Sequence, residues 1–228
     1  MDFGPFEERI SVRFKDKRLL ETAFTHRSYL NENRGTAREH NERLEFLGDA
    51  VLELASTEFL YAKYPQKPEG ELTAFRAALV NTNSISDAAV KLGMNDFLLL
   101  SRGEAKDTGR ARNIILANAF EAVIGAVYLD QGYTAAYDFI DAQLFHKTDD
   151  VVAKKLWQDA KSRFQEMAQE RVSITPTYEL ASQTGPDHDK LFVVAAYLGR
   201  EKIALGEGRS KQEAEQAAAE KALAAKGW

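Results

Sequence analysis

Three carboxylates stand within the nine residues from Asn41 to Asp49, in a segment that is otherwise apolar and helical in pattern. Glu42 and Asp49 are seven residues apart, about 700° of helical rotation, so their side chains leave the helix on nearly the same line. Glu45 lies slightly off that line. Aligned acids in a half-buried setting repel each other unless a cation, such as a divalent metal, neutralises them. The alternative is a solvated acidic stripe on an amphipathic helix, and the spacing by itself favours neither explanation.

A second polar pair, Asn118 and Glu121, lies far along the chain in a segment rich in alanine and other apolar residues. The two residues are three positions apart, on one face of a predicted helix. Two helices that each offer oxygen ligands from one face can build a site for Mg²⁺, which prefers oxygen and retains waters. The pair can equally reach solvent or cap a neighbouring helix, and the residues alone leave that open.

The segments that must position these acids have a helical pattern up to about residue 145. Apolar residues recur at helical spacing, with glycine- or proline-containing breaks between them, in 19–24, 44–60, 72–92, 114–129 and 133–144. An all-α domain is therefore predicted over residues 1–145. The connector at 146–157 contains no Gly or Pro, so it is predicted to be stiff or partly helical.

Residues 158–228 predict a small α+β domain. A helix at 159–171 precedes strands at 176–183, 191–198 and 202–206. Ser210 is the predicted N-cap of a helix that runs to Lys226, and Glu213 stands where a capping box requires it. The order α-β-β-β-α predicts helices packed on one face of a sheet.

Composition narrows the function classes. The net charge of −5 over 228 residues means that any contact with a polyanion must come from local basic clusters. The chain has no cysteine, which excludes disulfides and zinc–thiolate sites and fits a reducing compartment. The N-terminus lacks a secretory pattern, and no apolar run approaches the ~20 residues that span a bilayer. We therefore expect a cytoplasmic protein with no membrane partner.

These motifs together resemble a known family. Residues 42–49, with Ala-Phe-Thr-His-Arg-Ser-Tyr at 23–29 ahead of them, look like the signature of bacterial ribonuclease III. Residues 115–130 are similar to the second acidic motif of that family, and 158–228 resemble its double-stranded-RNA-binding domain. The resemblance covers essentially the whole chain. It implies an endonuclease that hydrolyses phosphodiester bonds of double-stranded RNA, leaving 5′-phosphate and 3′-hydroxyl ends, in the processing of ribosomal and other structured precursors.

The resemblance also implies a metal site that takes Mg²⁺, with Mn²⁺ as a substitute, and whose ligands are Glu42, Asp49, Asn118 and Glu121. Asp49 and Glu121 are the expected catalytic ligands. Asn118 departs from the family pattern, which has an acid at this position. An amide oxygen can ligate a metal but adds no charge, so weaker metal binding is the physical expectation. Because the rest of the motif is intact, we favour the interpretation that the amide is tolerated.

Cutting both strands of a duplex requires two sites, and the resemblance implies a homodimer with isologous pairing. Phe46 is a candidate interface anchor, although a lone aromatic is as readily a core residue. Glu45 and Glu69 are candidates for positions near the processing site or the interface. Glu69 fits equally well as a charge at a helix N-terminus, where the helix dipole favours an acid.

Three regions of the C-terminal domain are implied as RNA contacts, through minor-groove hydroxyls and phosphates. They are Gln165 and Glu166 on the first helix, Asp187 and His188 between the first two strands, and Arg209, Ser210 and Lys211 at the start of the last helix. Gln212 and Glu215 occupy positions where many such domains carry lysine, which predicts modest affinity for this domain alone.

Two rival functions remain at this level. A non-cleaving double-stranded-RNA-binding protein, weakened at its metal site by Asn118, predicts tight duplex binding without cutting. A metal-dependent nucleotide hydrolase on a helical scaffold explains the acids but leaves residues 159–228 without a role.

Overall fold

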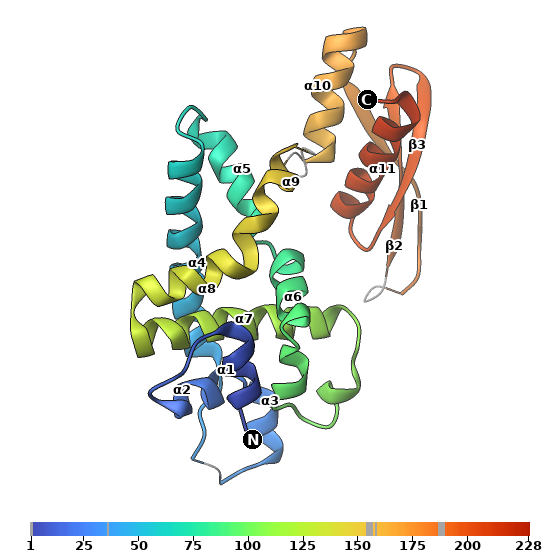
Figure 1. Ribbon diagram of the computed structural model, residues 1–228. Coiled ribbons are helices and arrows are strands. Elements are labelled where there is room, and N and C mark those ends of the chain that lie inside the picture. The colour runs from blue at the N-terminus through green and yellow to red at the C-terminus, as the bar shows by residue number, and fades with distance from the viewer. Residues whose placement is uncertain (1, 36, 154–156, 158, 187–189) are drawn as a thin grey trace. The chain divides into compact units, whose positions relative to one another are not determined.

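The computed structural model describes residues 2–35, 37–153, 157, 159–186 and 190–228 (Figure 1). The chain forms two compact units, Met1–Trp157 and Gln158–Trp228. Every named element of the first unit is helical, and the second unit contains a three-stranded sheet and two helices. The predicted fold class, an all-α domain followed by a small α+β domain, is confirmed.

The helices of the first unit follow the predicted apolar segments, with short 3₁₀ turns (η) between some of them. The two longest, α4 and α7, contain 22 residues each. The bounds are α1 Gly4–Ile10, α2 Lys17–Ala23, α3 Arg27–Glu32, α4 Glu42–Lys63, α5 Glu69–Leu79, α6 Thr82–Lys91, η1 Met94–Phe97, η2 Glu104–Lys106, α7 Arg110–Gln131, α8 Tyr133–Leu144, η3 Phe145–Lys147 and α9 Thr148–Ala153.

Helix α7 is the centre of the first unit. Its buried side chains lie on every side of the helix because α4, α6 and α8 all pack against it. A helix that is apolar all round belongs in a core or in a membrane, and α7 is long and apolar enough to cross a bilayer by composition alone. Most of that apolar stretch is buried inside the unit. Its role as a core helix therefore accounts for its composition.

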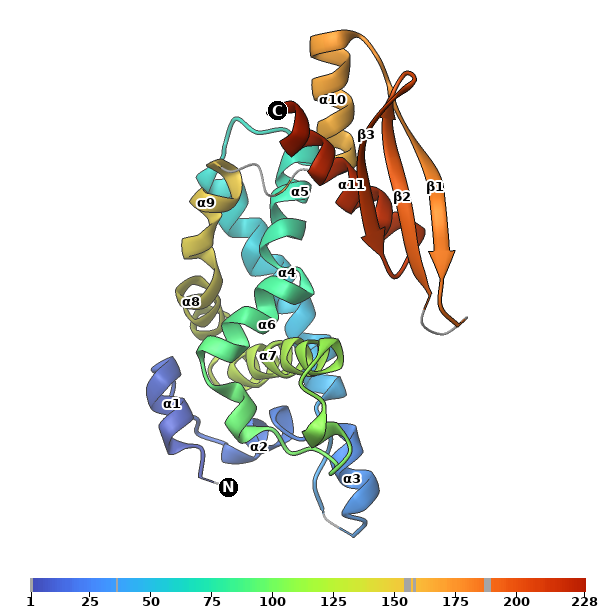
Figure 2. The same cartoon turned by 90° about the vertical axis from the view of Figure 1, so that its right-hand side faces the viewer.

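Two glycines allow α4 and α7 to cross with their backbones in contact (Figure 2). A Cβ atom added at Gly48 would collide with the carbonyl oxygen of Glu121, and one added at Gly125 would collide with the carbonyl oxygen of Leu44. Only glycine leaves room for such an approach. The crossing therefore fixes the point along each helix at which the acids of α4 and α7 face each other.

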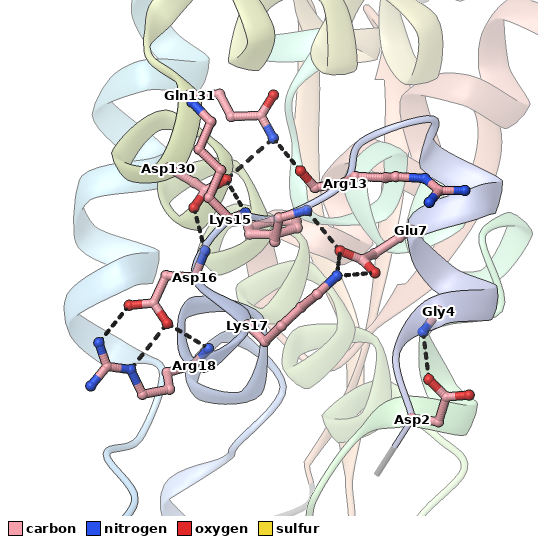
Figure 3. A network of polar contacts seen from close by, with 11 residues as sticks. Asp2, Gly4, Glu7, Arg13, Lys15, Asp16, Lys17, Arg18, Asp130 and Gln131 are labelled. Carbon is pink, nitrogen blue, oxygen red and sulfur yellow. Dashed lines mark hydrogen bonds and ion pairs between the residues drawn. The ribbon is translucent and has the colours of Figure 1, made fainter.

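The N-terminal segment is tied to the end of α7 by polar contacts (Figure 3). The Asp130 carboxylate accepts hydrogen bonds from the backbone N–H groups of Lys15 and Asp16, each at 2.9 Å. The buried Glu7 carboxylate forms an ion pair with Lys17 nearby. These contacts hold the turn between α1 and α2 against the end of α7.

The second unit is built on an antiparallel sheet in the order β1-β2-β3, and both of its helices cover the same face (Figure 2). Small alanine side chains of α11 and β2 let helix and sheet approach closely around the buried ring of Phe164. The predicted α-β-β-β-α order is confirmed, with boundaries shifted by one or two residues. The bounds are α10 Ala160–Val172, β1 Pro176–Thr184, β2 Leu191–Leu198, β3 Glu201–Gly208 and α11 Lys211–Lys226.

The predicted capping box at the start of α11 is confirmed. The backbone N–H of Glu213 donates to Ser210 Oγ at 3.1 Å, and Glu213 Oε2 accepts from the backbone N–H of Arg209 at 2.9 Å. The first bond satisfies an N–H group that the helix cannot satisfy internally, and the second ties the residue before the N-cap, Arg209, to the first turn. The cap therefore fixes where α11 begins, and with it the positions of Arg209 and Lys211 on either side of Ser210.

Candidate metal centre

The α4–α7 crossing brings acids from both helices together. Gly48 lies against the backbone of Glu121, and it is flanked on α4 by Glu45 and Asp49. Glu45 and Asp49 are four residues apart, so they occupy neighbouring positions on one face of the helix. Asn118 is partly buried one turn before Glu121 on α7. These four side chains form the candidate metal centre.

Electrostatics identify which acids interact. Burial raises the pKa of Glu121 to about 7, and the charges of Asp49 and Glu45 add to the increase. Burial also raises the pKa of Glu45, followed by the charges of Glu42 and Asp49. A raised carboxyl pKa means that the ionised form is disfavoured where it stands. A nearby divalent cation would remove that penalty.

Glu42 lies differently from the sequence prediction. Its carboxylate faces Arg27, with Nη1 3.4 Å from Oε1, and His40, with Nδ1 3.7 Å from Oε2. The charge of Glu42 is not among those that raise the pKa of Glu121, whereas the charge of Glu45 is. The structure therefore brings Glu45, and not Glu42, to the α7 acid.

The reason is that helical spacing specifies which residues share a line but not the point along the helix at which a neighbouring helix crosses it. Glu42 and Asp49 do share a line, but Glu42 is the first residue of α4, well before the crossing at Gly48. The glycine pair in the two motifs was the signal that would have located the crossing from the sequence. With it, Glu45 becomes the acid closest to Gly48 on the N-terminal side.

The donor set fits a hard divalent cation. Three carboxylates and one amide offer only oxygen ligands, which Mg²⁺ and related ions prefer. Within the part of the chain that the structure describes, no three acids or histidines are already grouped at metal-binding distances. Asp49 is exposed, so its side chain can rotate towards Glu121 at little cost.

Phe46 is not a core residue of the first unit, because 82% of its side chain is exposed. It lines a hollow of about 620 Å³ together with the partly exposed Leu47 and the exposed Leu129. Glu69 is the exposed first residue of α5, a position that fits a helix-dipole role as well as a functional one.

The expected RNA contacts of the second unit lie at its surface where they are described. Gln165 and Glu166 are exposed on α10 and line a shallow hollow of about 570 Å³. Lys211 is exposed at the start of α11, next to the capping residue Ser210. The predictions for Asp187 and His188 lie outside the described residues.

Glu215, where a lysine was expected, has an internal partner. Lys161 Nζ of α10 lies 2.6 Å from Glu215 Oε2, and the same ammonium lies 5.0 Å from the centre of the Tyr178 ring. The Lys161–Glu215 ion pair therefore joins α10 to α11. Because position 215 carries an acid and not a lysine, it adds no positive charge to the surface.

Comparisons with known proteins agree with both units. A family model described as ribonuclease-III-like matches residues 16–148, and one described as a double-stranded RNA binding motif matches residues 160–226. The chain is 48% identical over 222 residues to ribonuclease 3 of Bacillus licheniformis, which covers 97% of this chain and 89% of that protein. It is 45% identical over 217 residues to ribonuclease 3 of Enterococcus faecalis, with 95% and 94% covered.

A solved structure matches the first unit. The nuclease domain of ribonuclease III from Campylobacter jejuni superposes with a TM-score of 0.56 and 39% identity, over 62% of this chain and 98% of that one. That domain is described as flexible in a region involved in dimer formation. The acids at the α4–α7 crossing, the two matched domains and this degree of identity lead to one conclusion: the chain belongs to the ribonuclease III family.

Proposed function

We propose that this protein is an endoribonuclease that hydrolyses phosphodiester bonds in double-stranded RNA with the help of divalent metal ions. The observation that carries the proposal is that Glu45, Asp49 and Glu121 lie around the α4–α7 crossing, close enough for their charges to interact. A duplex-binding unit on the same chain supports RNA as the substrate. Cleavage leaves 5′-phosphate and 3′-hydroxyl ends, and the substrates are ribosomal and other structured precursors.

The residues that would hold the metal are Glu45, Asp49, Asn118 and Glu121, with Mg²⁺ as the ion and Mn²⁺ as a substitute. Glu42 stands outside this set because its carboxylate faces Arg27 and His40. A bound divalent metal supplies an activated water and stabilises the leaving oxygen. The protein contributes the positions of the oxygens, which the glycine crossing holds in place.

The active form is a homodimer, because two strands need two sites. An apolar stripe on α4 supports this proposal: Phe46, Leu54 and Tyr61 are spaced for one helical face, and their exposed fractions are 82%, 57% and 76%. The hollow beside Phe46 offers a place for the same ring of a second copy. Isologous pairing across such a face gives two equivalent sites, one for each strand.

The second unit adds affinity for the duplex. Gln165 and Glu166 on α10 can reach 2′-hydroxyl groups in the minor groove, and the N-terminus of α11 with Lys211 can hold a phosphate. The Lys161–Glu215 pair engages one lysine of α10, and Glu215 stands where many such domains carry a lysine. We therefore assign most of the cleavage-site selection to the nuclease dimer.

The test uses a perfect RNA duplex of roughly 30 base pairs, about twice the length that one such RNA-binding unit covers. The parent protein is expected to cut it in a Mg²⁺ titration, and Glu121→Gln is expected not to. Glu8→Gln, which removes an exposed acid from α1, is the matched control and should cut like the parent. Duplex binding by the parent without cutting in Mg²⁺ or Mn²⁺ would support the rival, a non-cleaving RNA-binding protein weakened by Asn118.

A further inference from the structure

One part of the sequence signature lies outside the acid cluster. Residues 23–28, the junction segment, join the end of α2 to the start of α3, whereas the proposed metal ligands lie on α4 and α7. The junction segment is hydrogen-bonded on two sides, to the residue before α4 and to the loop that leads to α7. It therefore contacts both elements that precede the helices of the metal centre.

The contact with α4 is made by Asn41, the N-cap residue of that helix, which is only 2% exposed. Its backbone N–H donates to the carbonyl oxygen of Thr25 at 2.9 Å, and its side-chain Nδ2 donates to the carbonyl oxygen of Ala23 at 3.3 Å. An asparagine at an N-cap ordinarily accepts a hydrogen bond from the first turn of its own helix. Asn41 makes no such side-chain bond, so its amide serves a long-range contact instead.

Asn81, the N-cap residue of α6, shows the ordinary arrangement. Its Oδ1 accepts from the backbone N–H of Ser84 at 2.9 Å, and the residue is exposed. The two positions carry the same residue type at the same place in a helix, yet only Asn41 is buried and directed at a distant segment. This difference indicates that Asn41 places α4 against the rest of the unit.

The placement of α4 bears directly on Glu45. The backbone N–H of Glu45 donates to the carbonyl oxygen of Asn41 at 2.9 Å, and Glu45 is the fourth residue of α4. The first turn of a helix lacks internal partners for its N–H groups and opens readily unless something outside the helix holds it. The position of the Glu45 carboxylate near Glu121 therefore depends on how Asn41 is held.

The loop before α7 is bonded to the same junction segment. The backbone N–H of Leu99 donates to the carbonyl oxygen of Phe24 at 2.9 Å, and the Leu99 carbonyl oxygen accepts from His26 at 3.0 Å. Two residues later, the backbone N–H of Ser101 donates to Ser28 Oγ at 3.0 Å. These bonds hold the start of the loop beside the segment that holds Asn41.

Arg112 joins the other end of this loop to α7. It is the buried third residue of that helix, and its guanidinium donates to the carbonyl oxygens of Glu104 at 2.8 Å and Asp107 at 3.0 Å. A continuous series of contacts thus runs from α7 through the loop and the junction segment to Asn41 and α4. This is a connection between the two ligand-bearing helices in addition to the glycine crossing.

We propose that Asn41 is a positioning residue that holds Glu45 in place at the metal centre by tying the start of α4 to the junction segment. The consequence for catalysis rests on the proposed metal-dependent cleavage, whereas the tie itself does not. Groups that orient metal ligands typically contribute roughly 10-fold to 100-fold to metal affinity or activity. A reacting group displaced by about 1 Å can cost roughly 100-fold in rate.

Asn41→Ser tests the role, because it removes the bond to Ala23 while supplying a hydroxyl that can cap α4 locally. It should weaken Mg²⁺ binding, measured by calorimetry, roughly tenfold and lower kcat roughly tenfold or more. KM for the duplex should stay within about twofold, since the expected RNA contacts lie on the second unit. Asn81→Ser, the same exchange at the N-cap of α6, is the matched control and should leave all three values unchanged. Parent-like Mg²⁺ affinity and kcat in Asn41→Ser would overturn the proposal.

A double-mutant cycle separates positioning from a general effect on the fold. If Asn41 acts through Glu45, then adding Asn41→Ser to Glu45→Gln should weaken Mg²⁺ binding by less than about twofold further, because the two changes affect one ligand. A further loss as large as that seen in the parent background would mean that Asn41 does not act through Glu45, and the proposal would be wrong.

Hydrogen exchange on the parent protein covers the case in which Asn41→Ser fails to fold. The N–H of an N-cap residue has no partner inside its helix, so protection of the Asn41 N–H must come from Thr25. We expect it to exchange at least roughly 100-fold more slowly than in an unstructured chain. Unprotected exchange would refute the tie. Absence of cleavage by the parent would contradict the proposed function, and the exchange rate would still decide whether Asn41 holds α4.

Discussion

Glu121 and Glu215 are both partly buried glutamates on helices that pack against another helix, yet their surroundings are opposite. Glu215 has a lysine ammonium at 2.6 Å, and the pair joins two elements of the RNA-binding unit. Glu121 has two further acids as its charged neighbours, and its pKa is raised to about 7.

The difference shows how a structural charge is told from a functional one. A paired charge adds to the stability of the fold or costs it little, so it needs no further explanation. A cluster of like charges costs stability and persists where a cation or a proton completes it. We therefore expect the catalytic reaction in the nuclease unit, which contains the clustered acids. In the RNA-binding unit, where the acid is paired with a lysine, we expect the charge to have a structural role.

The largest effect is expected from breaking the crossing that creates the acid cluster. Gly48→Ala forces a methyl group into the Glu121 carbonyl and should cost about 3 kcal/mol of unfolding free energy, with loss of cleavage. Gly70→Ala is the matched control, because a Cβ there meets nothing within 4 Å. Thermal unfolding of both variants measures the loss of stability. Equal melting temperatures would contradict the close approach of the α4 and α7 backbones.

Removing the Glu121 charge should be the next largest effect. Glu121→Gln should lower kcat roughly 100-fold or more, because one of the proposed metal ligands loses its charge. Glu215→Gln should leave kcat within about twofold and affect stability instead. Single-turnover cleavage rates on the duplex compare the two variants. Similar losses of rate in both would contradict the distinction between a functional Glu121 and a structural Glu215.

The acid cluster also predicts a pH dependence of stability in metal-free buffer. Glu121 has a folded-state pKa of about 7 against an ordinary 4.5, so the folded state binds the proton more tightly. Stability should therefore fall as the pH rises from 4.5 to 7, and Glu121→Gln should flatten that part of the profile. Denaturant titrations at several pH values measure it, and parallel profiles for the two proteins would refute the prediction.

A fourth acid in the cluster should strengthen metal binding. Asn118→Asp adds a charge one turn from Glu121 and should tighten binding of Mg²⁺ roughly tenfold, equivalent to ~1.4 kcal/mol. Calorimetric titration of Mg²⁺ measures the affinity directly, and the Mg²⁺ optimum for cleavage should move to lower concentration. An unchanged affinity would mean that the side chain at 118 does not face the metal.

The smallest effect is expected in the RNA-binding unit. Glu215→Lys exchanges an internal pair for an added cation on α11 and should raise duplex affinity roughly twofold to fivefold, with a steeper salt dependence. Lys161→Ala breaks the same pair without adding a cation, so it should not raise duplex affinity. Binding isotherms at several salt concentrations separate the two variants, and equal slopes would argue that α11 does not contact phosphate.

Much of the fold was predictable because its signals are local. Apolar periodicity specified the long helices, and Ser210 with Glu213 specified the start of α11, since each depends only on residues a few positions away. The departure at Asn118 was equally visible in the sequence. The order of elements in the RNA-binding unit followed from the same kind of pattern.

Other features required the tertiary structure. Helical spacing put Glu42 and Asp49 on one line, but α7 crosses α4 at Gly48, which is closer along the helix to Glu45 than to Glu42. The exposure of Phe46 could not be read from the chain, because a lone aromatic looks the same in a core and at a surface.

The sequence by itself determined which elements form and which residue types they carry, because backbone propensity, periodicity and capping act over a few residues. Only the tertiary structure decided which acids meet, since the two helices are separated by 46 residues and join through a backbone contact at Gly48 and Gly125. It likewise decided that Phe145–Ala153 and Trp157 pack with the nuclease unit. Contacts between distant segments depend on packing that no local pattern encodes.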